Sequence, residues 1–114
     1  MNMKVISLYT SILIILTLLS FGTFAAENHL NQAVQHAEAA VQSTDAKTIV
    51  EHAEEAKTHA EAAKAEKTQA AGGSSHLDAG IRSLSEAIKE GKLGAVDLAR
   101  KAAEQAVAHL KQAV

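Results

Sequence analysis

The sequence contains no cysteine, no proline and no tryptophan. Its few aromatic and sulfur-containing residues all lie within the first 24 positions, and they are Met1, Met3, Tyr9, Phe21 and Phe24. The lack of cysteine excludes a disulfide scaffold, a cysteine nucleophile, an iron–sulfur cluster and a thiolate metal site. Because no aromatic side chain follows Phe24, the rest of the chain also offers no stacking platform for nucleic acid bases.

The N-terminal segment has the pattern of a secretory signal peptide. Lys4 is the only charged residue among the first 26, residues 5–19 are mostly apolar, and small residues follow. A basic start, an apolar middle and a small-residue end predict a signal peptide over 1–25, cleaved after Ala25, and a periplasmic location. The alternative is an uncleaved membrane anchor, because residues 5–24 are just long enough to span a bilayer.

The remaining chain, residues 26–114, is mildly acidic. It holds 10 Lys and Arg residues against 13 Asp and Glu residues, a net charge of −3 with histidine neutral. Because it has no basic block, we expect no binding to nucleic acid and no stable membrane association after cleavage. No serine is accompanied by a convincing histidine and aspartate, so we also expect no enzymatic activity.

The same residues favour helices. They are rich in alanine, glutamate, lysine and glutamine, and no proline interrupts them. Turn signals occur at Thr44-Asp45, in the linker 71–75 and from Gly91 to Gly94, and apolar residues recur at helical spacing between them. The sequence predicts an all-α fold over 26–114, a four-helix bundle of two antiparallel hairpins (27–70 and 76–112), with helices at 27–42, 46–70, 76–90 and 95–112.

The apolar stripes of these helices are thin. Helix 46–70 has only Ile49 and Val50 as large apolar residues, and alanines follow them. We therefore expect a core of mostly small side chains and a marginally stable bundle. The four helices also align as copies of one unit, which suggests duplication of a hairpin. In that alignment Arg100 stands where an apolar residue is expected.

Six histidines occupy equivalent positions of this unit, seven residues apart within a helix: His29, His36, His52, His59, His76 and His109. Positions seven apart lie nearly above one another on a helix, and this row lies about 130° from the apolar stripe. We therefore expect the histidines on a flank or the outer face of the bundle, not in its core. Antiparallel turns at residue 44 and after residue 92 place them in level pairs, His36 with His52, His29 with His59, and His76 with His109.

Level histidines can share a metal ion. Ligands three or four residues apart on one helix also converge, so we expect the best local site at His52, Glu55 and His59. Imidazole and carboxylate ligands suit copper(II), nickel and zinc. Because only neutral imidazole binds metal, affinity should fall as the pH drops through the histidine range. The candidate ligands are His29, His36, His52, Glu55, His59, His76 and His109.

Five segments carry a resemblance to a known family: 33–41, 51–56, 71–76, 80–91 and 106–110. They are similar to the small metal-binding protein family, which comprises exported, histidine-rich helical proteins. The resemblance implies a four-helix bundle that sequesters metal in the periplasm, with copper(II) first and nickel or zinc as alternatives. Family members usually carry more histidines, and here other residues stand at five such positions, Ser43, Ala79, Ser83, Glu90 and Ala102. We therefore expect the tight site in the first hairpin.

Two other hypotheses fit the same sequence. One is a structural or interaction module with degenerate metal binding, in which the alanine stripe of helix 46–70 accepts a partner helix. Metal-independent dimerisation in sedimentation experiments would favour it. The other is a helical stress protein that stays loosely folded until a ligand binds, and circular dichroism of the metal-free form tests it.

Overall fold

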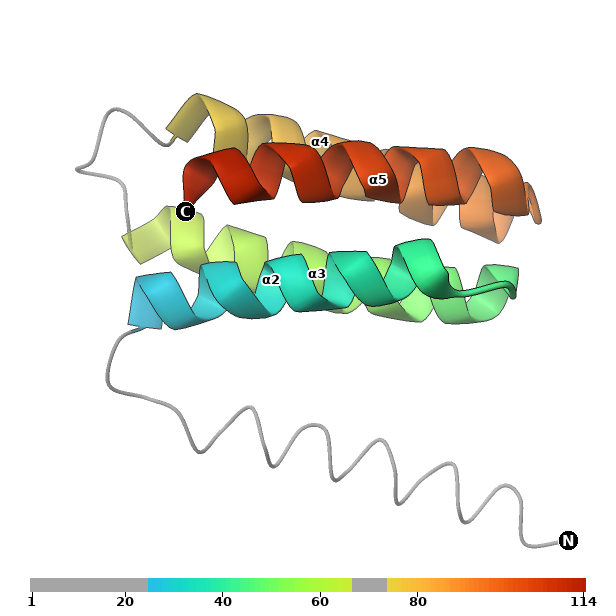
Figure 1. Cartoon of the computed structure of the whole chain (residues 1–114), viewed down its shortest axis with the longest axis horizontal. Helices are drawn as coiled ribbons and strands as arrows, with labels where there is room; N and C mark the ends of the chain where they lie inside the picture. Colours follow the sequence, from blue (N-terminus) through green and yellow to red (C-terminus); the bar gives the residue numbers. More distant parts are fainter. Residues whose placement is uncertain (1–24, 67–73) are drawn as a thin grey trace, which may run out of the picture.

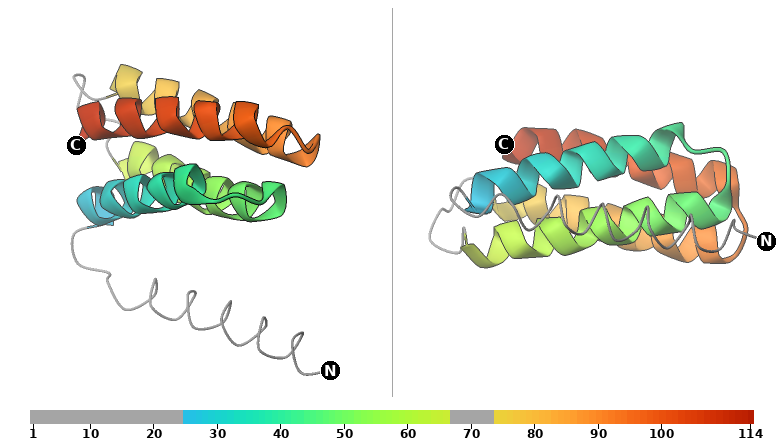
Figure 2. Two further views of the ribbon diagram at one scale, coloured as in Figure 1. Left: turned by 45° about the vertical axis from the view of Figure 1, so that its right-hand side comes forward. Right: turned by 90° about the horizontal axis from the view of Figure 1, so that it is seen from below.

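Four antiparallel helices make up almost all of the residues that the computed structural model describes, 25–66 and 74–114. In this part of the chain they are α2 (Ala25–Gln42), α3 (Ala46–Glu66), α4 (Ser74–Lys92) and α5 (Val96–Ala113). The hairpin α2–α3 forms one layer and the hairpin α4–α5 the other (Figure 1). Seen from below, α2 lies against α5 and α3 against α4 (Figure 2). The predicted four-helix bundle is confirmed.

The predicted helix limits agree with the observed ones to within two residues where both are described, and the end of α2 and the start of α3 agree fully. Helix α4 begins at Ser74 and ends at Lys92, two residues beyond the prediction at each end, so Ser74 and Ser75 belong to the helix and not to the linker. Helix α5 begins at Val96, one residue later than predicted. Residues 1–24 of the predicted signal peptide, 67–70 of the second helix and 71–73 of the linker lie outside the described residues.

The turn into α3 follows directly from its sequence. The Oδ2 atom of Asp45 accepts hydrogen bonds from both the backbone N–H and the hydroxyl of Thr48, each at 3.1 Å. An aspartate at this position satisfies one of the unpaired N–H groups at the start of a helix. Only residues 43–45 separate the end of α2 from the start of α3. Because this connection is so short, the two helices form an antiparallel hairpin.

The turn between α4 and α5 depends on a glycine. Gly94 adopts a φ of +78°, which a residue with a side chain rarely tolerates. The N–H of Ala95 donates to the carbonyl of Glu90 at 2.9 Å, and the N–H of Gly94 donates to that of Gly91 at 3.0 Å. These two bonds are the Schellman pattern that ends a helix. They confirm the turn that the glycines predict.

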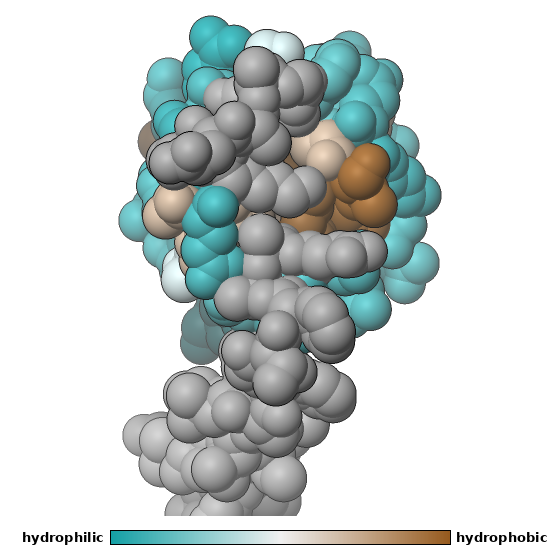
Figure 3. All heavy atoms as spheres, turned by 90° about the vertical axis from the view of Figure 1, so that its left-hand side faces the viewer, coloured by the Kyte–Doolittle hydropathy of each residue, from teal (hydrophilic) through white to brown (hydrophobic). Residues whose placement is uncertain are grey.

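The core between the layers is built mainly from alanine. Of the 18 buried apolar side chains in the described residues, 13 are alanine. The large fully buried ones are only five, namely Leu30, Ile49, Leu77, Leu84 and Leu110. From the end where α2 begins, hydrophilic atoms form most of the visible rim and hydrophobic atoms lie inside it (Figure 3). Alanine side chains are small, so they allow neighbouring helices to approach one another closely.

No helix within 25–66 or 74–114 is both long enough and apolar enough to cross a lipid bilayer. Lys64 and Asp78 form an exposed ion pair of 2.6 Å between α3 and α4, and Lys111 and Glu38 form one of 3.0 Å between α5 and α2. The two layers are therefore joined by polar contacts at the surface as well as by alanine packing.

Candidate metal centre

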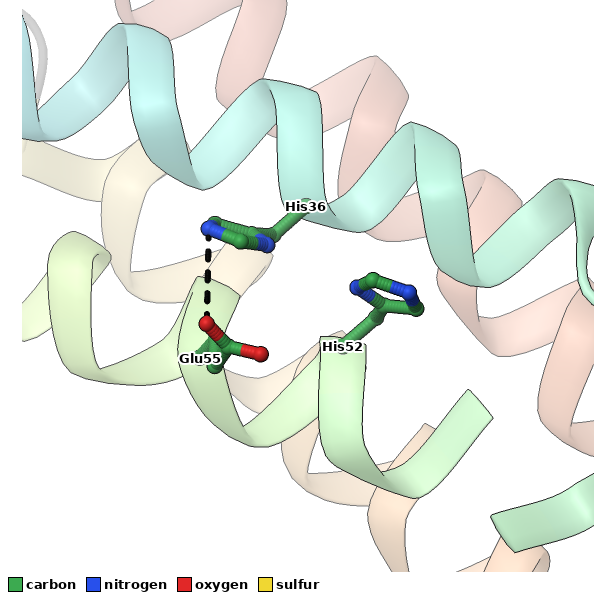
Figure 4. A group of neighbouring side chains, drawn as sticks. All are labelled: His36, His52 and Glu55. Atoms are coloured by element: carbon green, nitrogen blue, oxygen red, sulfur yellow. Dashed lines mark ion pairs between the residues drawn. The ribbon is translucent and has the colours of Figure 1, made fainter. Parts of the chain in front are cut away.

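Three candidate ligands converge between α2 and α3. His36 comes from α2, and His52 and Glu55 come from α3. One potential ligand atom from each residue lies within 4.8 Å of the other two. The three side chains point toward one another across the space between the helices (Figure 4). Within residues 25–66 and 74–114, this is the one group of at least three histidine, aspartate or glutamate residues whose potential ligand atoms converge to this extent.

Helix geometry explains the convergence. His52 and Glu55 are three residues apart on α3, and side chains at that spacing share one face of a helix. The antiparallel turn at Asp45 then places His36 level with His52, and their rings stack with centroids 5.8 Å apart. The cluster therefore takes two candidate ligands from α3 and the third from α2.

The contacts within the cluster leave ligand atoms available. The Nε2 atom of His36 lies 3.6 Å from Oε2 of Glu55, longer than a direct hydrogen bond. The Nδ1 atom of His52 is buried and has no hydrogen-bond partner in the described structure. Buried polar atoms are nearly always paired, so an unpaired nitrogen beside a carboxylate fits a place where a cation binds.

Burial keeps His36 in the form that binds metal. Desolvation lowers the pKa of His36 below its usual value, and nearby His52 lowers it further, while the Glu55 carboxylate raises it. The loss of hydration is the largest of the three effects. The imidazole is therefore neutral at pH 7, and its lone pair is free to bind a metal ion.

The histidine rings of the first hairpin form a continuous row. His52 stacks on His36, His36 stacks on His59 at 5.6 Å with the planes only 4° apart, and His59 meets His29 at 5.2 Å. The Nδ1 atoms of His29 and His59 are 3.0 Å apart, within hydrogen-bond distance. The row fills the groove between α2 and α3.

His59 corrects the expectation that the histidines avoid the interior. Its side chain is only 6% exposed, and its pKa is lowered to about 4, mainly by burial and then by His36 and His29. The helical wheel places the row away from the apolar stripe of its own helix. It does not take account of the neighbouring helix, which packs closely over that flank because the core side chains are alanines.

The local site expected within α3 also differs from the observed cluster. His52 and Glu55 belong to the cluster, but the third candidate ligand is His36 of α2 and not His59. His59 lies two helical turns from His52, about 10.5 Å along the axis, whereas His36 is level with it across the hairpin. Level pairing and the i, i+3 spacing are the sequence signals that indicate this set, and the tertiary structure shows that its ligand atoms converge.

The second hairpin holds a smaller arrangement. His76 of α4 and His109 of α5 stack with centroids 6.3 Å apart, so the third level pair is present as well. The Nδ1 atom of His109 is buried and has no hydrogen-bond partner in the described residues. Ser83 and Ala102 occupy the positions that correspond to His36 and His52, so the second hairpin lacks a counterpart of the three-ligand cluster.

Fold and site together define a helical-bundle protein with a histidine–carboxylate site between the helices of one hairpin. The chain belongs to the small metal-binding protein family, whose model matches residues 3–113. No curated protein matches the chain. The family assignment agrees with the resemblance seen in the sequence and with the chemistry of the converging side chains.

Proposed function

We propose that the protein binds a divalent metal ion, copper(II) in the first place, between α2 and α3 through His36, His52 and Glu55. The convergence of these ligand atoms within 4.8 Å carries the proposal. Ligands bound at about 2.0–2.2 Å to one ion lie roughly 3–4 Å from each other, so small side-chain rotations close the set.

The ligand types support the choice of metal. Residues 26–114 contain no cysteine and no methionine, so the strong ligands are imidazole and carboxylate. Such sites follow the Irving–Williams order, in which copper(II) binds most tightly and nickel and zinc follow. Nickel(II) and zinc are therefore the alternative ions.

The proposed role is to hold metal outside the cytoplasm and not to catalyse a reaction. The N-terminal pattern of Lys4, an apolar stretch and small residues up to Ala25 supports export to the periplasm. A binding role is favoured because the sequence offers no nucleophile with an aligned base. In the periplasm such a protein would buffer or sequester the ion.

Calorimetric titration with copper(II) at pH 7.5 tests the proposed site. We expect the unmodified protein to take up copper(II) and Glu55→Gln to weaken the tightest site at least tenfold, because the variant loses the anionic ligand. Glu51→Gln is the matched control, since Glu51 is an exposed glutamate of α3 outside the cluster. It should bind like the unmodified protein.

Two results would contradict the proposal. One is the absence of copper(II) uptake by the unmodified protein. The other is an equal loss of affinity in Glu51→Gln and Glu55→Gln, which would show that overall negative charge and not the cluster attracts the ion.

A further inference from the structure

An exposed leucine borders a pocket on the second hairpin. The side chain of Leu98 on α5 is 56% exposed. The pocket measures about 180 Å³ and is lined by Glu86, Glu90, Leu98, Lys101, Ala102 and Gln105. All of these residues belong to α4 or α5, so the pocket lies in the groove between these two helices. Ala102 corresponds to His52 in the repeat, and its small side chain leaves space where the first hairpin carries an imidazole ring.

The pocket has room for a leucine side chain from another chain. Cavities of about 150 Å³ take up a benzene molecule, which has more carbon atoms than the side chain of leucine. Moving an exposed leucine into such a pocket is favourable because apolar surface leaves water. Leu98 and the pocket lie on one surface, so two identical copies can each supply the side chain that the other receives.

The charges around the pocket also fit a second copy. Glu86 and Glu90 line it from α4, and Lys101 lines it from α5. Within residues 25–66 and 74–114, none of these three side chains belongs to an ion pair. A two-fold axis along the groove lays α5 of each copy over α4 of the other at the same level. This arrangement brings Lys101 of each copy toward Glu86 of the other, because both residues line one pocket.

The alanine stripe of α3 offers no comparable surface. Its residues are buried within the bundle, namely Ala53, Ala56, Ala60 and Ala63. The chain's own helices therefore already cover the stripe that the sequence offered to a partner helix. Contact with a second copy needs a surface that the bundle leaves exposed, and the α4–α5 groove combines an exposed leucine, a pocket and charges of both signs.

We propose that two copies of the chain form a two-fold symmetric dimer across their α4–α5 grooves, with Leu98 of each copy in the pocket of the other. Lys101 of each copy pairs with Glu86 of the other at the rim of the pocket. The contact involves few residues, so the dimer is weak and dilution separates it. The inference is independent of the proposed copper(II) site, because that site lies in the other hairpin and the dimer needs no metal ion.

Sedimentation equilibrium with a chelator present tests the dimer. As the protein concentration rises to about 0.5 mM, we expect the mass to rise toward that of two chains, as for a weak association. Leu98→Gln should raise the dissociation constant roughly tenfold or more, because it removes the apolar anchor of the contact. Val114→Gln is the matched control, since Val114 is a large exposed apolar residue outside the pocket. It should associate like the unmodified protein.

Charge reversal tests the pairing between copies. Lys101→Glu and Glu86→Lys should each be monomeric alone, because like charges then meet at both ends of the symmetric contact. An equimolar mixture of the two variants should form a dimer, since each opposite-charge pair is restored between unlike copies. Lys47→Glu makes the same charge change at an exposed position of α3 and should leave dimerisation of the chain unchanged.

Four results would overturn the dimer: a monomer at every concentration, association that is unchanged in Leu98→Gln, association that appears only when copper(II) replaces the chelator, and a mixture of the charge variants that stays monomeric. Circular dichroism confirms that each variant is folded. Calorimetric copper(II) uptake by the unmodified protein is a separate measurement, so the dimer and the proposed function can fail independently.

Discussion

His59 is the buried polar side chain of the described core, and it is ionisable. Its pKa of about 4 arises mainly because burial removes water from the charged form. At pH 7 the ring is neutral in both the folded and the unfolded chain, so its burial carries no electrostatic penalty. Protonation of His59 is therefore unfavourable in the folded chain, and the stability of the first hairpin depends on pH.

The metal-free protein should lose stability in acid because of His59. In the unfolded chain the imidazole takes up a proton below about pH 6.5, but in the folded chain only below about pH 4. The stability from the neutral ring is thus complete above pH 6.5 and is lost as the pH falls toward 4. The loss amounts to about 3 kcal/mol, measured as the free energy of unfolding in urea with a chelator present.

His59→Gln separates this effect from general acid denaturation. The amide of glutamine does not titrate in this range, so the variant should show a smaller fall in the free energy of unfolding between pH 7 and pH 4.5. An identical fall in the variant and the unmodified protein would show that the folded His59 titrates like an exposed histidine.

At the scale of the helices, Arg100 explains an irregularity of the sequence. It occupies a position where the repeat pattern expects an apolar residue, yet its side chain is only partly exposed. Its Nε–H donates to the carbonyl of Val41 at 3.0 Å, across the interface between α5 and α2. Carbonyls in the last turn of a helix lack partners within the helix, and a positive charge there is favourable. Arg100 thus joins the end of α2 to the other layer.

Replacing Arg100 should weaken the packing of α2 on α5. Arg100→Met keeps much of the aliphatic length but removes the charged donor, and we expect a loss of about 1.5–3 kcal/mol in the free energy of unfolding. Thermal or urea denaturation followed by circular dichroism measures the change.

Lys101→Met is the control, because Lys101 is the exposed neighbour on α5 and surface substitutions usually change stability by less than about 0.5 kcal/mol. A loss in Arg100→Met no larger than that of the control would mean that the contact with Val41 contributes nothing.

At the scale of the whole molecule, the two hairpins differ in the side chains that they bury. Three of the five large buried aliphatic residues belong to α4 and α5, namely Leu77, Leu84 and Leu110. The hairpin α2–α3 contributes Leu30 and Ile49 and fills its groove with four histidine rings. The second hairpin therefore holds more of the large buried aliphatic side chains, and the first holds the converging candidate ligands.

Export of the whole chain is a separate prediction. When the chain is produced in a Gram-negative host, we expect it in the periplasmic fraction with Ala26 as its first residue, as determined by mass spectrometry. Leu16→Arg should block export because it places a charge in the apolar stretch, whereas Asn2→Arg adds to the basic start and should not. A full-length chain in the membrane fraction would favour the uncleaved anchor instead.

Helix positions and level pairing were predictable from the sequence because both follow from local rules. Helix propensity, the Asp45 cap and the glycines near residue 94 set the limits of the helices. Antiparallel turns then align His36 with His52 and His29 with His59. The burial of His59 was not predictable from a single helix, because the neighbouring helix covers it.

Periodicity and turn chemistry were therefore enough to establish the number of helices, their order and the residues available as ligands. The tertiary structure decided that His36, and not His59, completes the group with His52 and Glu55. It also decided that His59 lies in the groove facing His29. The physical reason is the distance between helices. The small alanine side chains in the core set that distance. The distance in turn determines which side chains of neighbouring helices come into contact.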